Sequence, residues 1–155
     1  MTPPARIRPF TPADLPGCLA LFDSNCPPFF DPSERADYEQ FLRDPDDHGD
    51  YFVLEREGEL LACGGVWLKA DEPQAAGLSW GMVRRDRHGA GLGGQLPTFR
   101  LGWIRKRWPG VNTVRINTGQ RTEGYFTRHG FVVTGRTPDG FAPGLDDVAM
   151  ALRLG

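Results

Sequence analysis

The stretch that decides the fold runs from residue 78 to residue 94 and reads LSWGMVRRDRHGAGLGG. Its first six residues have the character of a strand, and its last six include four glycines. A helical pattern follows, with large apolar residues recurring on one face: Leu92, Leu96, Phe99 and Trp103. A second strand pattern covers residues 111–118. Strand, glycine-rich turn, helix and strand together make a parallel crossover unit.

Strand and helix patterns alternate on both sides of this unit. The other strand patterns cover residues 7–10, 51–56, 60–68, 131–136 and 147–154. The other helical patterns begin after Thr11, after Asp31 and at Thr122. Residues 57–59 and 137–140 have the composition of hairpin turns. The order β-α-α-β-β-β-α-β-α-β-β predicts an α/β fold with a mixed, mostly antiparallel central sheet flanked by helices.

Length and composition exclude several classes of protein. The chain has 155 residues, which suits a single domain over residues 1–155, and 39% of them are hydrophobic, so global disorder is excluded. No apolar run approaches the roughly 18 residues of a membrane span, and the N-terminus lacks the apolar core of a signal peptide. Three cysteines without C-x-x-C spacing argue against a disulfide framework or a zinc site. We therefore expect a cytoplasmic protein without a metal.

Charge is distributed unevenly along the chain. Residues 31–59 hold eleven acidic side chains against three arginines, a balance of −8, whereas residues 84–107 have a balance of +6. Both segments are compatible with ordinary solvated surface. The alternative is a molecule with an anion-binding side and a cation-attracting side. A nucleic-acid-binding protein would be basic overall, and the net charge here is −2.

The glycine-rich residues 89–94 suggest an anion site. Glycine lets the backbone approach a ligand, and free N–H groups at a helix start bind phosphate. Besides a plain turn without a ligand, two phosphate sites fit. The first is a dinucleotide site, because GAGLGG matches G-x-G-x-x-G. That pattern expects an acidic residue at the end of the next strand, but residues 115–118 read RINT, so the dinucleotide site is disfavoured.

The second phosphate site is the pyrophosphate loop of coenzyme A. Residues 83–93 resemble the acetyl-CoA loop of the GCN5-related N-acetyltransferases, the GNAT family, which follows a strand and runs Q/R-x-x-G-x-G/A into a helix. Residues 88–93 read HGAGLG, with His88 in the place of the usual Arg or Gln and Arg87 one position earlier. Residues 125–131, YFTRHGF, resemble the family's F-Y-x-x-x-G-F segment. The element order agrees with the family over residues 7–154.

The resemblance implies an acetyl-CoA-dependent N-acetyltransferase that moves an acetyl group directly to a primary amine of a small molecule or peptide. Residues 78–83 would pair with the pantetheine arm, and a backbone N–H at Met82 or Val83 would stabilise the oxyanion. The implied cofactor-binding residues are Met82, Val83, Arg87, His88, Gly89, Ala90, Gly91, Leu92, Gly93 and Gly94. We expect neither a nucleic-acid nor a membrane partner, and leave a homodimer open.

The protonation of the leaving thiolate has one side-chain candidate. The family often uses the tyrosine of F-Y-x-x-x-G-F to protonate the leaving thiolate, but that position is Phe126 here and Tyr125 lies one residue earlier. Tyr125 is therefore the candidate catalytic residue, with a packed aromatic as the alternative. No carboxylate lies within residues 78–83, and the acids elsewhere, Asp31, Glu34 and Glu123, also suit helix starts.

Because the usual acid tyrosine and a base carboxylate on residues 78–83 are missing, two functions other than acetyl transfer also fit the sequence. A non-catalytic acyl-CoA sensor of the same fold needs neither an acid nor a base, and a nucleotide-phosphate module needs only the glycine loop. For an enzyme, the resembling fold brings the second helix and its following loop to the acceptor side. The acidic residues 31–59 would then attract a cationic acceptor.

Overall fold

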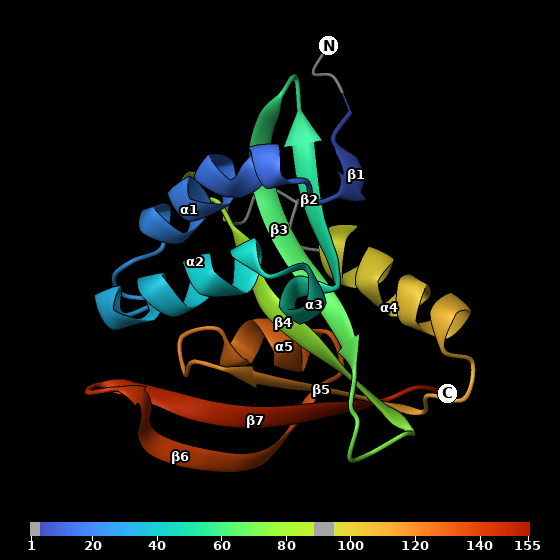
Figure 1. The fold of residues 1–155 in the computed structure, drawn as a ribbon. Helices are drawn as coiled ribbons and strands as arrows, with labels where there is room; N and C mark the ends of the chain where they lie inside the picture. Colours follow the sequence, from blue (N-terminus) through green and yellow to red (C-terminus); the bar gives the residue numbers. More distant parts are fainter. Residues whose placement is uncertain (1–3, 89–94) are drawn as a thin grey trace.

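The computed structural model describes residues 4–88 and 95–155 and holds a seven-stranded sheet in the order β1-β2-β3-β4-β5-β7-β6 (Figure 1). The strands are β1 (Arg6–Pro9), β2 (Asp50–Arg56), β3 (Glu59–Leu68), β4 (Ala75–Val83), β5 (Thr113–Thr118), β6 (Val132–Ala142) and β7 (Leu145–Arg153). The helices are α1 (Leu15–Ser24), α2 (Arg35–Arg43), α3 (Pro45–His48), α4 (Gln95–Arg107) and α5 (Glu123–Arg128). Neighbouring strands pair antiparallel except β4 and β5, which confirms the predicted mixed α/β sheet.

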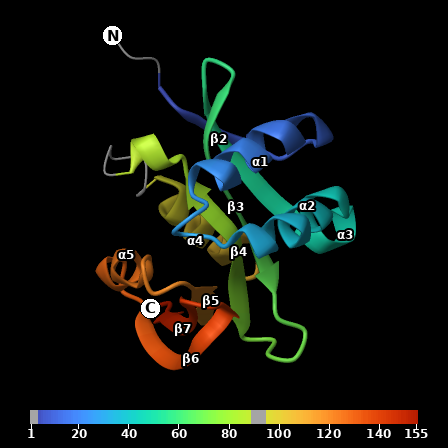
Figure 2. The same ribbon diagram turned by 90° about the vertical axis from the view of Figure 1, so that its left-hand side faces the viewer.

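Helices cover both faces of the sheet (Figures 1 and 2). α1, α2 and α3 lie on one face, whereas α4 and α5 lie on the other. Each face has its own buried cluster: Phe22 and Tyr38 belong to the first, and Ile104 and Phe126 to the second. The sheet therefore separates two apolar layers. Side chains from both layers can contact a ligand that binds at the edge of a strand.

β4 and β5 are paired over only part of their lengths. Ala75, Ala76 and Gly77 pair with residues 113–115, and the pairing ends there although β4 continues to Val83. From Leu78 onward the β5-facing edge of β4 has no strand partner among the residues that the structure describes. Figure 1 shows β4 and β5 diverging. The backbone of residues 78–83 therefore has an open edge to which an extended ligand can add.

The last hairpin corrects one sequence-based prediction. β6 runs through residues 137–140, which we expected to form the turn, and the chain reverses instead after Ala142. Gly144 has φ +81°, a conformation that favours glycine, and supplies that turn. Asp139 explains the difference, because its carboxylate accepts a 2.7 Å hydrogen bond from the Gly144 N–H. Residues 137–140 therefore form an irregular end of β6, and Asp139 stabilises the turn at Gly144.

The region after α2 holds a short helix that the sequence did not predict. The sequence Asp44-Pro45 predicts the end of the helical region that begins after Asp31, and α2 does end there, but α3 follows directly. The Asp44 carboxylate accepts a 3.0 Å hydrogen bond from the Asp46 N–H, so Asp44 caps this new helix. Because Pro97 suits only the start of a helix, the sequence also predicts that the next helix begins near Gly93, which lies outside the described residues. Pro97 falls in the first described turn of α4, where a missing N–H is tolerated.

Candidate active site

The middle of β4 contains a bulge. Cys63 pairs with Met82 and Gly65 with Ser79, so β4 has one residue more than β3 between the two pairs. Trp80 lies in this interval with φ +35°, which is unusual for a large side chain. Such backbone strain persists only where the surroundings enforce it, and it gathers at functional sites. The bulge lies on the stretch of β4 that has the open edge.

A chain of buried hydroxyl groups holds the bulge from below. Tyr51 donates a 2.6 Å hydrogen bond to the carbonyl oxygen of Trp80. Tyr38 and Tyr51 are joined by a 2.8 Å bond, and Tyr38 lies 3.2 Å from the sulfur of Cys63. Because the Tyr51 proton is used at Trp80, Tyr38 donates to Tyr51 and accepts from the Cys63 thiol. Burial raises the pKa of both tyrosines well above the ordinary value, so the donors stay protonated.

The end of β4 is fixed from two sides. The buried side chain of Asn25, just after α1, donates a 2.9 Å hydrogen bond to the carbonyl oxygen of Val83. The Nε2 of His88 lies 2.9 Å from the same oxygen and donates to it as the Nε2–H tautomer. The His88 ring therefore lies against the end of β4. In the sequence, His88 stands at the motif position where an Arg or Gln is usual.

The expected cofactor-binding residues are only partly described. Met82 is buried in the cluster under α1 and α2, Val83 is half-buried, and Arg87 lies in a 3-10 turn with an Nε that meets no acceptor among the described residues. Gly89, Ala90, Gly91, Leu92, Gly93 and Gly94 lie outside the described residues. The described part brings together the strand end and the turn that lead into the glycine segment.

The two aromatic residues on α5 have different surroundings. Phe126, at the position of the family's tyrosine, is 7% exposed and packs in the core against Phe131. Tyr125 is half-buried, and its ring centroid lies 4.6 Å from that of His129 with the two ring planes tilted by 45°. Burial raises the pKa of Tyr125, while the charge of Arg100 on α4 opposes that rise. Tyr125 is therefore the α5 aromatic with a hydroxyl on the α4 side.

The acidic residues considered as general bases have structural partners. Glu34 accepts a 2.9 Å hydrogen bond from the Asp31 N–H, and Asp31 accepts one of 2.9 Å from the Ser33 N–H, so both cap the 3-10 turn Pro32–Glu34 that leads into α2. Glu123 pairs with Arg136 at 2.9 Å. These partners agree with the helix-start interpretation of all three carboxylates.

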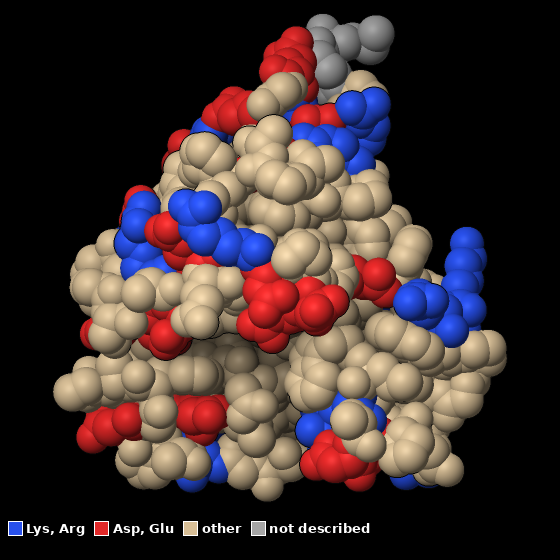
Figure 3. All heavy atoms as spheres, viewed as in Figure 1, with Lys and Arg blue, Asp and Glu red and all other residues tan. Residues whose placement is uncertain are grey.

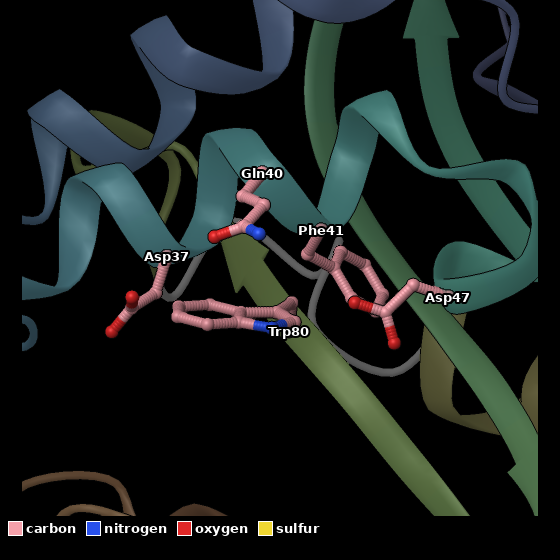
Figure 4. Close-up of a pocket in the computed structure, with 5 residues that line it drawn as sticks. All are labelled: Asp37, Gln40, Phe41, Asp47 and Trp80. Carbon is pink, nitrogen blue, oxygen red and sulfur yellow. The ribbon is translucent and has the colours of Figure 1, made fainter.

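A hollow of about 420 Å³ lies between α2, α3 and the bulge. It is lined by Asp37, Gln40, Phe41, Asp47 and Trp80. Figure 4 shows the indole of Trp80 beneath α2, with the carboxylate of Asp37 toward one end and that of Asp47 toward the other. Figure 3 shows acidic side chains gathered over α3, beside the recess below α2. An aromatic face between carboxylates favours a cation.

Sequence reasoning missed three residues of the site. Tyr51 resembles an ordinary aromatic of a core strand, and Asn25 an ordinary residue after a helix. Arg100 gave no signal, because one arginine in a helix is normally at the surface. In the structure it is 2% exposed and lies against β3 and β4.

The described structure combines an open mixed sheet with a bulged central strand, and the sequence continues from that strand into a glycine-rich segment and a helix. The sequence profile described as "Acetyltransferase (GNAT) family" matches residues 18–131. The chain therefore belongs to the GNAT acetyltransferase family. A sequence comparison with curated proteins finds no match.

Solved structures share the fold over nearly the whole chain. The chain is similar to Ard1 from Thermoplasma volcanium, with a TM-score of 0.78 and 16% identity over 97% of this chain and 98% of that one. A ribosomal-protein-alanine N-acetyltransferase from Brucella melitensis gives 0.74 and 22% over 96% and 99%. The ribosomal-protein-S18-alanine N-acetyltransferase from Escherichia coli gives 0.75 and 18% over 98% and 95%. At these identities the likeness is one of fold.

Within residues 4–88 and 95–155 no helix combines the length and apolar character that a membrane crossing requires. The same residues contain no group of three or more His, Cys, Asp or Glu side chains arranged to hold a metal ion.

Proposed function

We propose that this protein is an acetyl-CoA-dependent N-acetyltransferase whose acceptor is a cationic primary amine of a small molecule or peptide. The observation that carries the proposal is the position of Trp80. Its backbone forms the bulge on the open edge of β4, and its indole lines the hollow with Asp37 and Asp47. One residue thus borders both the strand edge suited to the cofactor and the hollow suited to the amine.

On the cofactor side, the pantetheine arm adds to the edge of β4 beyond Gly77, and residues 89–94 hold the pyrophosphate. The thioester then lies near Met82 and Val83, where a backbone N–H donates to the carbonyl oxygen as it becomes an oxyanion. Support comes from the fixed carbonyl of Val83, because Asn25 and His88 occupy it and hold the strand end in place.

On the acceptor side, an ammonium group enters between the carboxylates of Asp37 and Asp47 and over the indole of Trp80. Both carboxylates are exposed, so they attract the cation before it binds more than they hold it afterwards. The bound ammonium loses a proton to water in the open hollow, and the amine nitrogen attacks the thioester carbon. The charge division along the chain, −8 over residues 31–59 and +6 over residues 84–107, supports this polarity.

An acceptor panel tests this proposal. Acetyl-CoA consumption is measured with matched amines that carry a neighbouring cation, a neutral amide or a carboxylate, each at low and high salt. We expect the cationic acceptors to have the highest kcat/KM and to lose most of that advantage at high salt. A preference for anionic acceptors, or salt-independent kcat/KM for the cationic ones, would refute the cationic acceptor.

A non-catalytic acyl-CoA sensor is the second candidate, favoured by one observation. The α5 residue at the family's acid position is the buried Phe126, which has no proton to give. A sensor would bind acetyl-CoA without turning it over with any amine of the panel. For either candidate, the three free cysteines fit a reducing, cytoplasmic location.

A further inference from the structure

Arg100 is a buried cation without a carboxylate partner among the described residues. Its side chain comes from the middle of α4 and is 2% exposed. Nη1 donates a 3.2 Å hydrogen bond to the carbonyl oxygen of Gly65, and Nε meets no acceptor within the described part of the chain. A guanidinium stays charged in proteins, and burying it unpaired is strongly unfavourable. A buried charge of this kind indicates a ligand or a reaction that supplies the opposite charge.

Glycines make room for the guanidinium beside the bulge. A Cβ atom on Gly64 of β3 would lie 2.9 Å from Nη1, and one on Gly81 of β4 would lie 2.7 Å from Nη2. Any larger residue at either position would push the guanidinium away. Gly81 lies between Trp80 and Met82, so the cation touches β4 where the open edge and the bulge coincide.

The groups whose charges interact with Arg100 are weak acids rather than carboxylates: Tyr125 on α5, Tyr51 on β2 and Cys63 on β3. Burial lowers the pKa of Arg100, and it raises the pKa of Tyr125 and Tyr51, so both tyrosines stay protonated near neutral pH. Burial opposes the ionisation of the Cys63 thiol, but neighbouring hydrogen bonds and the charge of Arg100 together lower its pKa. No carboxylate among the described residues balances the charge of the guanidinium.

We propose that the Arg100 guanidinium stabilises the sulfur of coenzyme A as a thiolate when the acetyl group leaves. The inference rests on the proposed function, which brings the thioester to Met82 and Val83, next to Gly81. The amine nitrogen bonds to the carbonyl carbon, and the C–S bond breaks with its electron pair passing to sulfur. The protonated amide nitrogen gives its proton to water. The products are the acetylated amine and a thiolate that faces the guanidinium.

This role explains why the α5 helix can lack a tyrosine at the usual position. A leaving thiolate needs either a proton or a nearby positive charge, and Arg100 supplies the charge without a proton transfer. Phe126 can then serve as a core residue. Tyr125 is then an uncharged residue near the guanidinium and does not transfer a proton.

Substitution of Arg100 separates this role from a structural one. Methionine has a similar length and no charge, and replacing a buried charged group by an apolar one of like volume is often tolerated by the fold. We expect Arg100→Met to lower kcat about 100-fold while the KM for acetyl-CoA stays within about threefold. Arg100→Lys keeps the charge and should recover a large part of kcat. Arg153→Met, at the exposed end of β7, is the matched control and should behave as the wild type.

The decisive readout is the ionisation of the bound product thiol. Free CoA is titrated in complex with the wild type and with Arg100→Met, following the ultraviolet absorbance of the thiolate, with desulfo-CoA complexes as blanks. We expect the wild type to lower the thiol pKa by about one unit or more, and Arg100→Met to abolish that shift. A bound thiol that ionises like free CoA in the wild type would overturn the inference even if the variant fails to fold.

The same titration distinguishes failure of the inference from failure of the proposed function. If neither CoA nor desulfo-CoA binds the wild type, the proposed function is wrong. If both bind, but the thiol pKa is the same in the wild type and in Arg100→Met, coenzyme A is the ligand and Arg100 does not stabilise its thiolate.

Discussion

The hydroxyl of Tyr51 donates a 2.6 Å hydrogen bond to the carbonyl oxygen of Trp80, and so ties the strained residue of the β4 bulge to the core. Tyr51 is 2% exposed and lies on the opposite side of β3 from β4 in the strand order, so the bond passes beneath β3. The bulge is therefore held by the packing of β2 and α2, not by local turn chemistry. The shape of this stretch of β4 therefore depends on the core.

Tyr51→Phe tests this dependence, because it removes one hydroxyl and keeps the ring. The buried carbonyl of Trp80 loses its donor, so we expect the free energy of unfolding to fall by about 1–3 kcal/mol. We also expect kcat to fall, because the bulge relaxes. Urea unfolding and thiol-release kinetics measure the two effects. Tyr38→Phe is the control, since it leaves the bond to Trp80 in place and should lower kcat less. Equal kcat values for wild type and Tyr51→Phe would show that catalysis does not need this bond.

The carboxylates of the hollow should affect acceptor binding more than chemistry. For Asp37→Asn and Asp47→Asn we expect the KM of a cationic amine to rise about threefold to tenfold with kcat little changed, because exposed charges contribute modestly and are screened by salt. Asp46→Asn is the matched control: it lies on α3 but does not line the hollow. If Asp46→Asn raises KM as much as Asp47→Asn, the effect is general surface charge rather than the hollow.

Tyr125→Phe should reduce turnover by less than about tenfold, since charge stabilisation by Arg100 makes a tyrosine acid unnecessary. Thiol release under saturating acetyl-CoA and amine gives kcat directly. Loss of a true general acid would lower kcat by roughly 100-fold to 10,000-fold. A loss of that size with unchanged KM would assign the proton transfer to Tyr125.

The helices and strands whose residues follow a local sequence pattern could be predicted. Apolar periodicity predicted the helices and strands. The first four residues of the YFTRHGF segment lie in α5, and Gly130, whose φ is +93°, follows the end of that helix. The prediction of a turn over residues 137–140 was wrong. A composition typical of turns does not distinguish a turn from an irregular strand end beside a turn. Tyr51, Asn25 and Arg100 could not be predicted, since each acts on an element distant in sequence: β4 for Tyr51 and Asn25, and β3 and β4 for Arg100. A contact between one side chain and an element distant in sequence leaves no periodic pattern from which it could be predicted.

Acid sensitivity should come in part from the pair of Arg8 and Asp14. Arg8 donates two hydrogen bonds of 2.8 Å to the Asp14 carboxylate, which is 8% exposed, and they lower the pKa of Asp14 in the folded state. The unfolded chain, with an Asp pKa of about 3.9, binds the proton first as pH falls. The pair therefore stabilises the fold fully above about pH 5 and loses its contribution as pH falls toward the folded pKa.

Urea unfolding of the wild type and of Asp14→Asn, at about pH 7 and about pH 3, checks this effect. The substitution should cost about 1 kcal/mol or more at neutral pH, and the difference should shrink at acid pH. A constant difference across this range would mean that ionisation of Asp14 does not contribute.

We expect a catalytic site for acetyl transfer around the β4 bulge. The direct test is the release of free CoA thiol from acetyl-CoA by the wild-type protein with a cationic primary amine, with mass spectrometry of the amine. Gly91→Asp is the control variant, because it sets a negative side chain against the expected pyrophosphate, whereas Gly110→Asp adds the same charge at an open position. We expect one acetylated amine per thiol released by the wild type and by Gly110→Asp, and neither product with Gly91→Asp. Binding of acetyl-CoA by the wild type without release of CoA thiol in the presence of any amine would contradict a catalytic site.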